Sequence, residues 1–104
     1  MLYADLGAKK LLAAQKEGQK IAVEIKSFLS PSPINDLEQA LGQYIIYTQI
    51  LSDQQPECLL YLAITEDIFS GFFSEELPQS VIRFNQVKLL IFKPETEEIV
   101  EWIT

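Results

Sequence analysis

The sequence predicts an α/β domain in which a mixed β-sheet is crossed by one long helix and flanked by short helices. Three observations support this fold class. Short strand-like segments fill the first 28 residues, an amphipathic stretch follows over residues 34–51, and a nearly continuous apolar run occupies residues 57–64. Strands that alternate with helices in this order are typical of a sheet with helices packed on it. A length of 104 residues predicts one domain, residues 1–104.

The first strands are expected to form a three-stranded meander. Residues 2–5 and 10–15 predict two short strands, and residues 16–19 predict the turn into a third strand over residues 20–28. The third segment is rich in β-branched and aliphatic residues, which favour strands.

A long helix is expected next, starting at Ser32 or Pro33, which suit an N-cap and a first helical position. Apolar residues then recur at intervals of three and four, which predicts one core-facing stripe. The stripe consists of Ile34, Leu37, Leu41, Tyr44, Ile45, Thr48 and Leu51. Residues 53–56 end the helix.

The second half of the chain predicts further sheet and two short helices. The apolar run 57–64 suggests a central strand, parallel to the third strand through the helical crossover. Residues 65–67 can cap a short helix, and residues 78–85 suggest another. Strands are expected over 87–92 and 98–103, the last half-exposed because acidic and apolar residues alternate in it.

Composition limits the chemistry. Hydrophobic residues make up 48% of the chain, and no apolar run approaches the roughly 20 residues needed to span a bilayer, so we expect a soluble, cytoplasmic protein. The absence of histidine excludes His-based zinc sites, Ser-His-Asp triads and Cys-His pairs. Carboxylate, lysine, tyrosine and amide groups remain, a set that suits Mg²⁺ or Mn²⁺.

The charge of the chain bears on any contact with nucleic acid. A net charge of −7 opposes DNA binding, which depends largely on neutralising phosphates. A DNA-binding role therefore requires bound divalent ions, a basic partner, or clustering of the eight Lys and Arg residues around a cleft.

The strongest candidate site combines Asp5 with Glu24 and Lys26. Strand alternation places Glu24 and Lys26 on the same face, where burial is costly unless they pair, bind a metal or open onto a cleft. Asp5, Glu24 and the Ile25 carbonyl could supply oxygen ligands to Mg²⁺, and Lys26 could then orient the attacking water or stabilise charge on phosphorus. Alternatively, Glu24 and Lys26 are ordinary solvent-facing strand residues, and Asp5 belongs to an Asp-Leu-Gly turn.

Two helical residues extend this candidate site. Gln39, Gln43 and Tyr47 are spaced four apart and therefore share one side of the helix, beside the apolar stripe. Gln43 and Tyr47 are expected to reach over the sheet to the substrate backbone. The alternative is that they only border the stripe at the helix surface.

Asp5, Glu24-Ile25-Lys26 and Gln43-x-x-x-Tyr47 resemble the Asp, Glu-x-Lys and Gln-x-x-x-Tyr motifs of PD-(D/E)XK nucleases. More closely, residues 3–8, 19–30, 40–44 and 99–103 are similar to XisH, a family of cyanobacterial factors named for controlling excision of the fdxN element. The Ala-Val-Glu-Ile-Lys-Ser-Phe run is the most distinctive part of this similarity, which extends over essentially the whole chain.

The resemblance implies a restriction-endonuclease-like fold, a possible Mg²⁺-dependent endonuclease serving DNA recombination, and a companion protein similar to XisI. It also implies a core helix before the first strand, whereas Met1 stands only four residues before Asp5. Without that helix, we expect an exposed apolar patch that a homodimer or a partner fills. The rival interpretation is a non-catalytic accessory module that keeps the nuclease scaffold and binds a partner protein.

Overall fold

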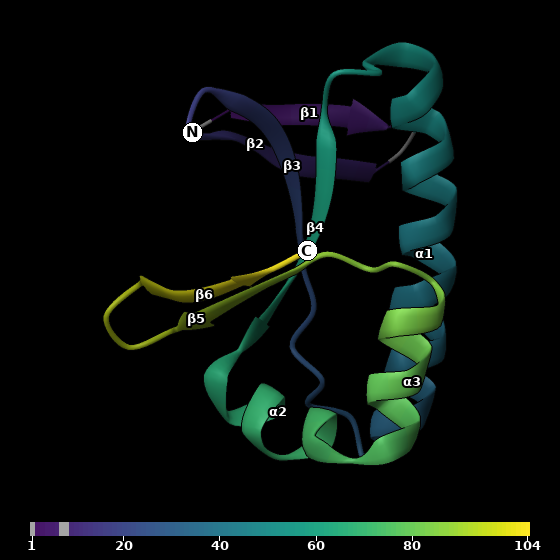
Figure 1. Ribbon diagram of the computed structural model, residues 1–104, viewed down its shortest axis with the longest axis vertical. Helices are drawn as coiled ribbons and strands as arrows, with labels where there is room; N and C mark the ends of the chain where they lie inside the picture. Colours follow the sequence, from purple (N-terminus) through teal and green to yellow (C-terminus); the bar gives the residue numbers. More distant parts are fainter. Residues whose placement is uncertain (1, 7–8) are drawn as a thin grey trace.

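The computed structural model describes the backbone of residues 2–6 and 9–104, and the side chains from residue 14 onward. Six strands form one mixed sheet whose spatial order follows the chain (Figure 1). The strands are β1 (Leu2–Leu6), β2 (Lys9–Lys16), β3 (Gln19–Ile25), β4 (Leu59–Thr65), β5 (Leu89–Lys93) and β6 (Glu98–Ile103). The pairs β3–β4 and β4–β5 are parallel, and the other three neighbouring pairs are antiparallel.

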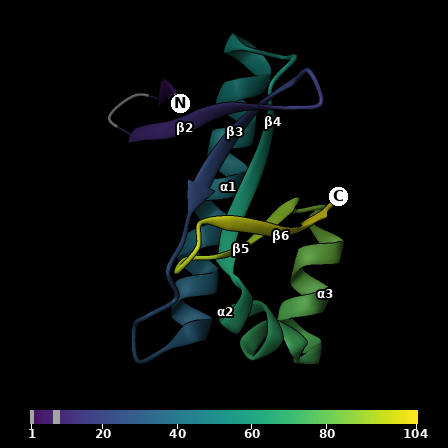
Figure 2. The ribbon, with the colours of Figure 1, turned by 90° about the vertical axis from the view of Figure 1, so that its left-hand side faces the viewer.

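The helices pack on one face of this sheet. They are α1 (Pro33–Gln54), α2 (Glu66–Ser70), the 3₁₀ helix η1 (Phe72–Ser74) and α3 (Glu76–Phe84). Residues of α1, η1 and α3 belong to the same buried core cluster as β4 and β5, and partly buried residues of α2 pack against it. Figure 2, turned by 90° from Figure 1, looks onto the sheet with α1 behind it. Among the described residues, no helix is both long enough and apolar enough to cross a membrane.

Local sequence signals account for most of these elements. The meander β1–β2–β3 is confirmed, and its second turn has Glu17 at φ 53° and Gly18 at φ 82°, the left-handed pair that a two-residue hairpin requires. Ser32 caps α1, because its Oγ accepts from the Asn35 amide at 3.2 Å. Thr65 caps α2 in the same way, as predicted, at 3.3 Å from the Ile68 amide.

The prediction that the third strand reaches residue 28 is wrong. Strand β3 ends at Ile25, and Phe28 adopts a left-handed backbone with φ 53°. This conformation is unfavourable for a bulky residue. It is offset by packing, because the Phe28 ring is buried with centroids 5.9 Å from Phe72 and 5.4 Å from Phe73. The aromatic residues that follow β4 therefore turn the chain out of the sheet.

The predicted core stripe of the long helix is only partly right. Leu37, Tyr44 and Leu51 are buried as expected, together with Ala40. The other predicted members Ile34, Ile45 and Thr48 are exposed. Helix α1 turns the line of Leu37, Ala40 and Tyr44 toward the sheet, and the exposed residues lie to the side of this line. The apolar spacing therefore predicts correctly that α1 has a core-facing stripe, but it does not predict which residues lie at the middle of that stripe.

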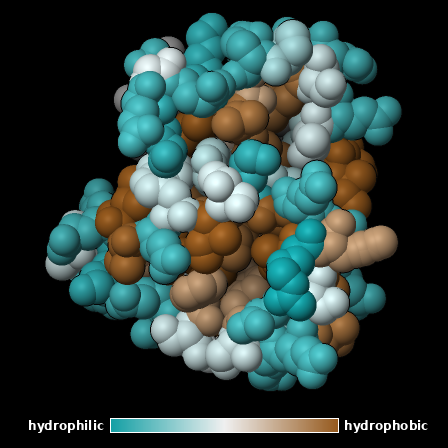
Figure 3. Space-filling view, viewed as in Figure 1, coloured by the Kyte–Doolittle hydropathy of each residue, from teal (hydrophilic) through white to brown (hydrophobic). Residues whose placement is uncertain are grey.

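The core consists of one cluster on each face of the sheet. The larger cluster lies under the helices and includes Leu60, Leu62 and Ile64 of β4. The smaller lies on the opposite face and includes Tyr61 and Ala63 of the same strand. Strand β4 is therefore a central strand buried on both faces, as predicted. Figure 3 shows apolar residues across the centre of the view and at parts of its left-hand and right-hand margins, with hydrophilic residues over most of the rest of the outline.

Candidate functional site

Glu24 lies near the end of β3, on the face that α1 covers. Its neighbour on this face, Ala22, belongs to the core cluster under the helices, whereas Ile21 and Val23 belong to the cluster on the other face. Glu24 is only 2% exposed, and its Oε2 atom is inaccessible to solvent. A carboxylate at this depth is stable only with compensating charge or hydrogen bonds. Glu24 is therefore not a solvent-facing strand residue.

Lys26 follows the last residue of β3 and still pairs with β4. Its backbone amide donates to the Ala63 carbonyl at 3.1 Å. Its Nζ atom donates to Oε1 of Gln39 on α1 at 3.3 Å. The lysine side chain therefore points toward the helix, on the side of the sheet that the strand alternation predicted for Glu24 and Lys26.

The two helical residues of the predicted site follow Gln39 along α1. Gln43 is partly buried one turn further on, and Tyr47 is partly buried against the core a turn beyond it. Because Gln39 contacts Lys26, this side of α1 is the side that faces the end of β3. The shared helix side predicted for Gln39, Gln43 and Tyr47 is consistent with this arrangement, while their contacts with a substrate stay a prediction.

The other two predicted ligands are placed differently. The backbone of Asp5 belongs to β1 and pairs with Lys10, but its side chain lies outside the residues whose side chains are described. The Ile25 side chain is 55% exposed and lines a hollow on the opposite sheet face. The role of its backbone carbonyl as a metal ligand stays a prediction. Among residues 14–104, no group of three or more Cys, Asp or Glu side chains is arranged to hold a metal ion.

Sequence reasoning missed the residue that holds the loop after Lys26. Asp36, in the first turn of α1, is buried, and its Oδ2 atom accepts from the Ser30 hydroxyl at 2.8 Å and from the Ser30 amide at 3.2 Å. This pair ties the end of the loop to the start of α1. The sequence signal for this residue was an acidic side chain shortly after the Ser-Pro-Ser-Pro run. An acidic residue at this position is equally typical of an exposed charge in the first turn of a helix, so the signal did not distinguish the two cases.

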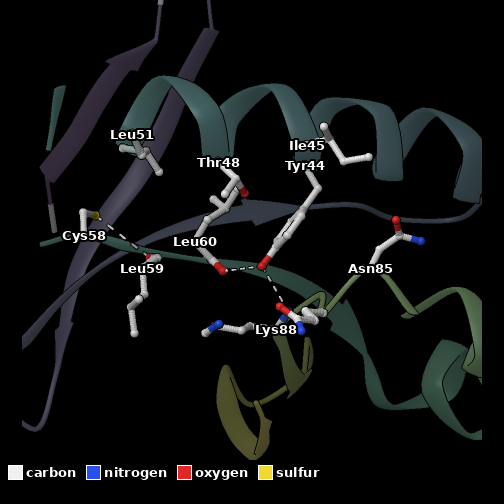
Figure 4. A pocket seen from close by; sticks show the side chains of 10 residues that line it. Tyr44, Ile45, Thr48, Leu51, Cys58, Leu59, Leu60, Asn85 and Lys88 are labelled. Atoms are coloured by element: carbon white, nitrogen blue, oxygen red, sulfur yellow. Dashed lines mark hydrogen bonds between the residues drawn. The ribbon is translucent and has the colours of Figure 1, made fainter. Parts of the chain in front are cut away.

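Tyr44 fixes α1 against the sheet at a second, smaller hollow of about 280 Å³ (Figure 4). Its hydroxyl donates to the Leu60 carbonyl at 2.9 Å and accepts from the Lys88 amide at 3.0 Å. Burial raises the pKa of this tyrosine above its ordinary value, because the charged form loses hydration. The hydroxyl is therefore a structural link between α1, β4 and the start of β5.

Removing this link by Tyr44→Phe is expected to lower the free energy of unfolding by about 1–2 kcal/mol, because two backbone groups lose their partner. The raised pKa adds a pH dependence: the unfolded tyrosine loses its proton first, near pH 10.0, so this contribution to stability is lost as the pH rises further. Urea denaturation between pH 7 and 11 measures both effects. Equal stability of the variant and the wild type would contradict the assigned hydrogen bonds.

Comparison with known proteins identifies relatives of this chain. The family model described as XisH protein matches residues 1–100. A crystal structure of an XisH family protein from Nostoc punctiforme PCC 73102 is 44% identical with a TM-score of 0.88, covering 99% of this chain and 83% of that one. A crystal structure of an fdxN element excision controlling factor protein from Anabaena variabilis is 42% identical with a TM-score of 0.87, covering 99% and 82%. Among curated proteins, none matches.

The matched positions include every residue of the candidate site, from Asp5 to Tyr47, since the family model extends over residues 1–100. Both structural relatives share the mixed α/β architecture over nearly the whole of this chain. The similarity first noted in the Ala-Val-Glu-Ile-Lys-Ser-Phe run is thus confirmed at the level of the family. The chain belongs to the XisH family.

Proposed function

We propose that this chain is a nuclease-like factor that serves excision of a DNA element by site-specific recombination, with a PD-(D/E)XK-type magnesium site at Glu24. The name of the Anabaena variabilis relative, an fdxN element excision controlling factor, supports the excision role. The observation that carries the nuclease part is the burial of the Glu24 carboxylate beside a lysine that reaches across to α1. The strand meander, the crossover helix and the parallel central strand are elements that the resemblance to PD-(D/E)XK nucleases also implies, so they support the proposal.

The donor set fits a hard divalent cation. Glu24 and Asp5 offer carboxylate oxygens and Ile25 offers its carbonyl, which are the ligands that Mg²⁺ and Mn²⁺ prefer. When bound, Mg²⁺ would supply Lewis-acid polarisation of the scissile phosphodiester. The burial of Glu24 would strengthen the attraction between its carboxylate and the cation, because water screens buried charges less than exposed ones.

The remaining residues would act on water and substrate. Lys26 would orient the attacking water and stabilise negative charge that develops on the phosphate oxygens. Its bond to Gln39 holds the Nζ atom near α1 before substrate arrives, so the lysine needs little rearrangement. Gln43 and Tyr47 would position the DNA backbone by hydrogen bonding from the same side of the helix.

Plasmid nicking in Mg²⁺ or Mn²⁺ tests this function. Lys26→Ala is expected to lower the nicking rate at least about 100-fold, because it removes a charge that acts only in the transition state. Lys20→Ala is the matched control, since Lys20 lies on the same strand but forms an exposed ion pair with Glu57 at 3.5 Å. Nicking that survives Lys26→Ala undiminished would assign the activity to another site or another protein.

A second candidate function is a non-catalytic accessory module that binds a partner similar to XisI. Two features favour it: the net charge of −7, which opposes unassisted DNA binding, and the hollow opposite α1, at whose rim Ile25 and Ile99 are exposed. In this case the scaffold would recruit a partner and leave strand cleavage to a separate recombinase.

A further inference from the structure

The sheet face opposite the helices carries an apolar hollow whose floor, including Ile21, Val23 and Leu90, is buried and whose rim is exposed. In the described part of the chain, every helix packs on the α1 side, and Figure 2 shows the strands of the other side uncovered. A hollow of about 430 Å³ lies on this face. Its apolar lining includes Ile21, Val23, Leu90, Phe92, Ile99 and Trp102. We refer to this hollow and its lining as the open sheet face.

The open sheet face is closed at the end near Trp102 and exposed toward the turn between β5 and β6. Trp102 of β6 packs edge-on against Tyr61 of β4 with ring centroids 5.0 Å apart, and Lys16 of β2 places its Nζ atom 5.0 Å from the Trp102 ring centroid. Trp102 therefore lies between the Tyr61 ring and the Lys16 side chain and covers this end of the hollow. Ile25 and Ile99 remain 55% and 51% exposed, so the apolar rim of the hollow is in contact with water.

The other end of the open sheet face is acidic. Glu97 lines the hollow itself, beside Pro94. Residues 93–98, which are the turn between β5 and β6 and one strand residue on each side of it, include three glutamates and one lysine, and all four side chains are exposed. An occupant of the hollow therefore meets apolar side chains in the middle and negative charge at this end.

We propose that the open sheet face binds an amphipathic helix of a partner protein whose flanking residues are basic. A helix is the element that covers the face of a sheet, whereas a strand would add at an edge. Basic flanks complement the glutamates of the turn. A second copy of this chain is disfavoured, because two chains of charge −7 repel each other. This proposal rests on the partner-binding function and specifies the chemistry of the partner.

The open sheet face also adjoins the candidate nuclease site through one strand. The Ile25 side chain lines the hollow, while Glu24 and Lys26 on either side of it belong to the α1 side. A helix bound in the hollow would therefore contact the same strand end that carries the site. A bound partner helix could therefore shift the end of β3 and with it the positions of Glu24 and Lys26.

Fluorescence of Trp102 tests the proposal, because it is the only tryptophan of the chain and lines the hollow. The probe is a synthetic helical peptide without tryptophan, with leucines on one face and lysines on its flanks. We expect a saturable blue shift, and binding about tenfold weaker for the same peptide with glutamates in place of the lysines. We also expect Ile99→Glu to weaken binding at least about tenfold, because it places a charge among the apolar contacts.

Ile46→Glu is the matched control, since Ile46 is 56% exposed on α1, away from the hollow. It should leave peptide binding unchanged. Equal binding of both peptides, or binding that survives Ile99→Glu, would overturn the proposal. So would a dimer, seen by sedimentation, that Ile99→Glu dissociates, because the occupant would then be a second copy. Magnesium titration of the Ile99→Glu protein separates the two functions: retained metal binding with lost peptide binding leaves the nuclease proposal intact.

Discussion

Replacing Glu24 by glutamine is expected to weaken Mg²⁺ or Mn²⁺ binding at least about 100-fold, because the variant keeps the shape of the side chain but loses the buried negative charge. Glu24 is 2% exposed, so its carboxylate interacts with a cation with little screening by water. Isothermal titration calorimetry measures the loss directly. Circular dichroism of the metal-free protein establishes that Glu24→Gln remains folded.

Glu38→Gln is the control for this titration, since Glu38 is an exposed residue of α1. A specific ligand role also predicts a stability effect, because a cation that binds only the folded state raises the midpoint of thermal unfolding. Mg²⁺ should therefore raise the midpoint of the wild type and of Glu38→Gln but not that of Glu24→Gln. Indistinguishable titrations of Glu24→Gln and wild type would remove Glu24 from the proposed metal site.

Truncating Phe28 to alanine is expected to lower the free energy of unfolding by about 3–5 kcal/mol, which is the usual range when a buried aromatic side chain is replaced by alanine. The ring is 4% exposed and contacts Phe72 and Phe73, so its loss leaves a cavity between β3 and the short helices. Without these contacts nothing offsets the left-handed backbone at φ 53°. Urea denaturation followed by Trp102 fluorescence gives the change.

Leu29→Ala is the control for the Phe28 variant, because Leu29 is the next residue and is 84% exposed. It should change stability by less than about 0.5 kcal/mol. If the two substitutions destabilise the protein equally, the aromatic cluster does not anchor this loop. The loop bears on the proposed site because it starts at Lys26 and ends at the Ser30–Asp36 hydrogen bonds.

The elements that local chemistry determines could be predicted from the sequence. Ser32 and Thr65 both cap helices, because a hydroxyl at the start of a helix can accept a hydrogen bond from a backbone amide of the first turn. The alternation in β3 correctly separates Ile21 and Val23 from Ala22 and Glu24, since a strand has only two faces. The order of strands and helices then predicts a mixed sheet with a parallel crossover, which the structure confirms.

The features that depend on distant contacts could not be predicted. Strand β3 stops at Ile25 because Phe28 packs against aromatic residues more than 40 positions later in the chain. Ile45 fits the helical stripe but is exposed, because the direction in which α1 crosses the sheet decides which edge of a stripe is covered. The contact between Lys26 and Gln39 depends on the same crossing.

The candidate site follows the same division. Strand alternation suffices to place Glu24 and Lys26 on one face, but it leaves open whether that face meets water or a helix. Asp36 shows the limit of sequence patterns. Its position is typical of an acidic residue in the first turn of a helix, and its burial against Ser30 depends on the folded arrangement of the loop. Partnership of Asp5 with Glu24 depends on the side chains of β1 and stays a prediction.

The most direct test of the proposed site is the position of a bound cation. Crystals grown or soaked in Mn²⁺ and measured for anomalous scattering would locate the ion independently of any activity. The proposal predicts an anomalous peak about 2.0–2.3 Å from a Glu24 carboxylate oxygen, with an Asp5 carboxylate oxygen within about 5 Å of that of Glu24. No peak at Glu24, or a separation of the two carboxylates beyond roughly 10 Å, would contradict a shared metal site.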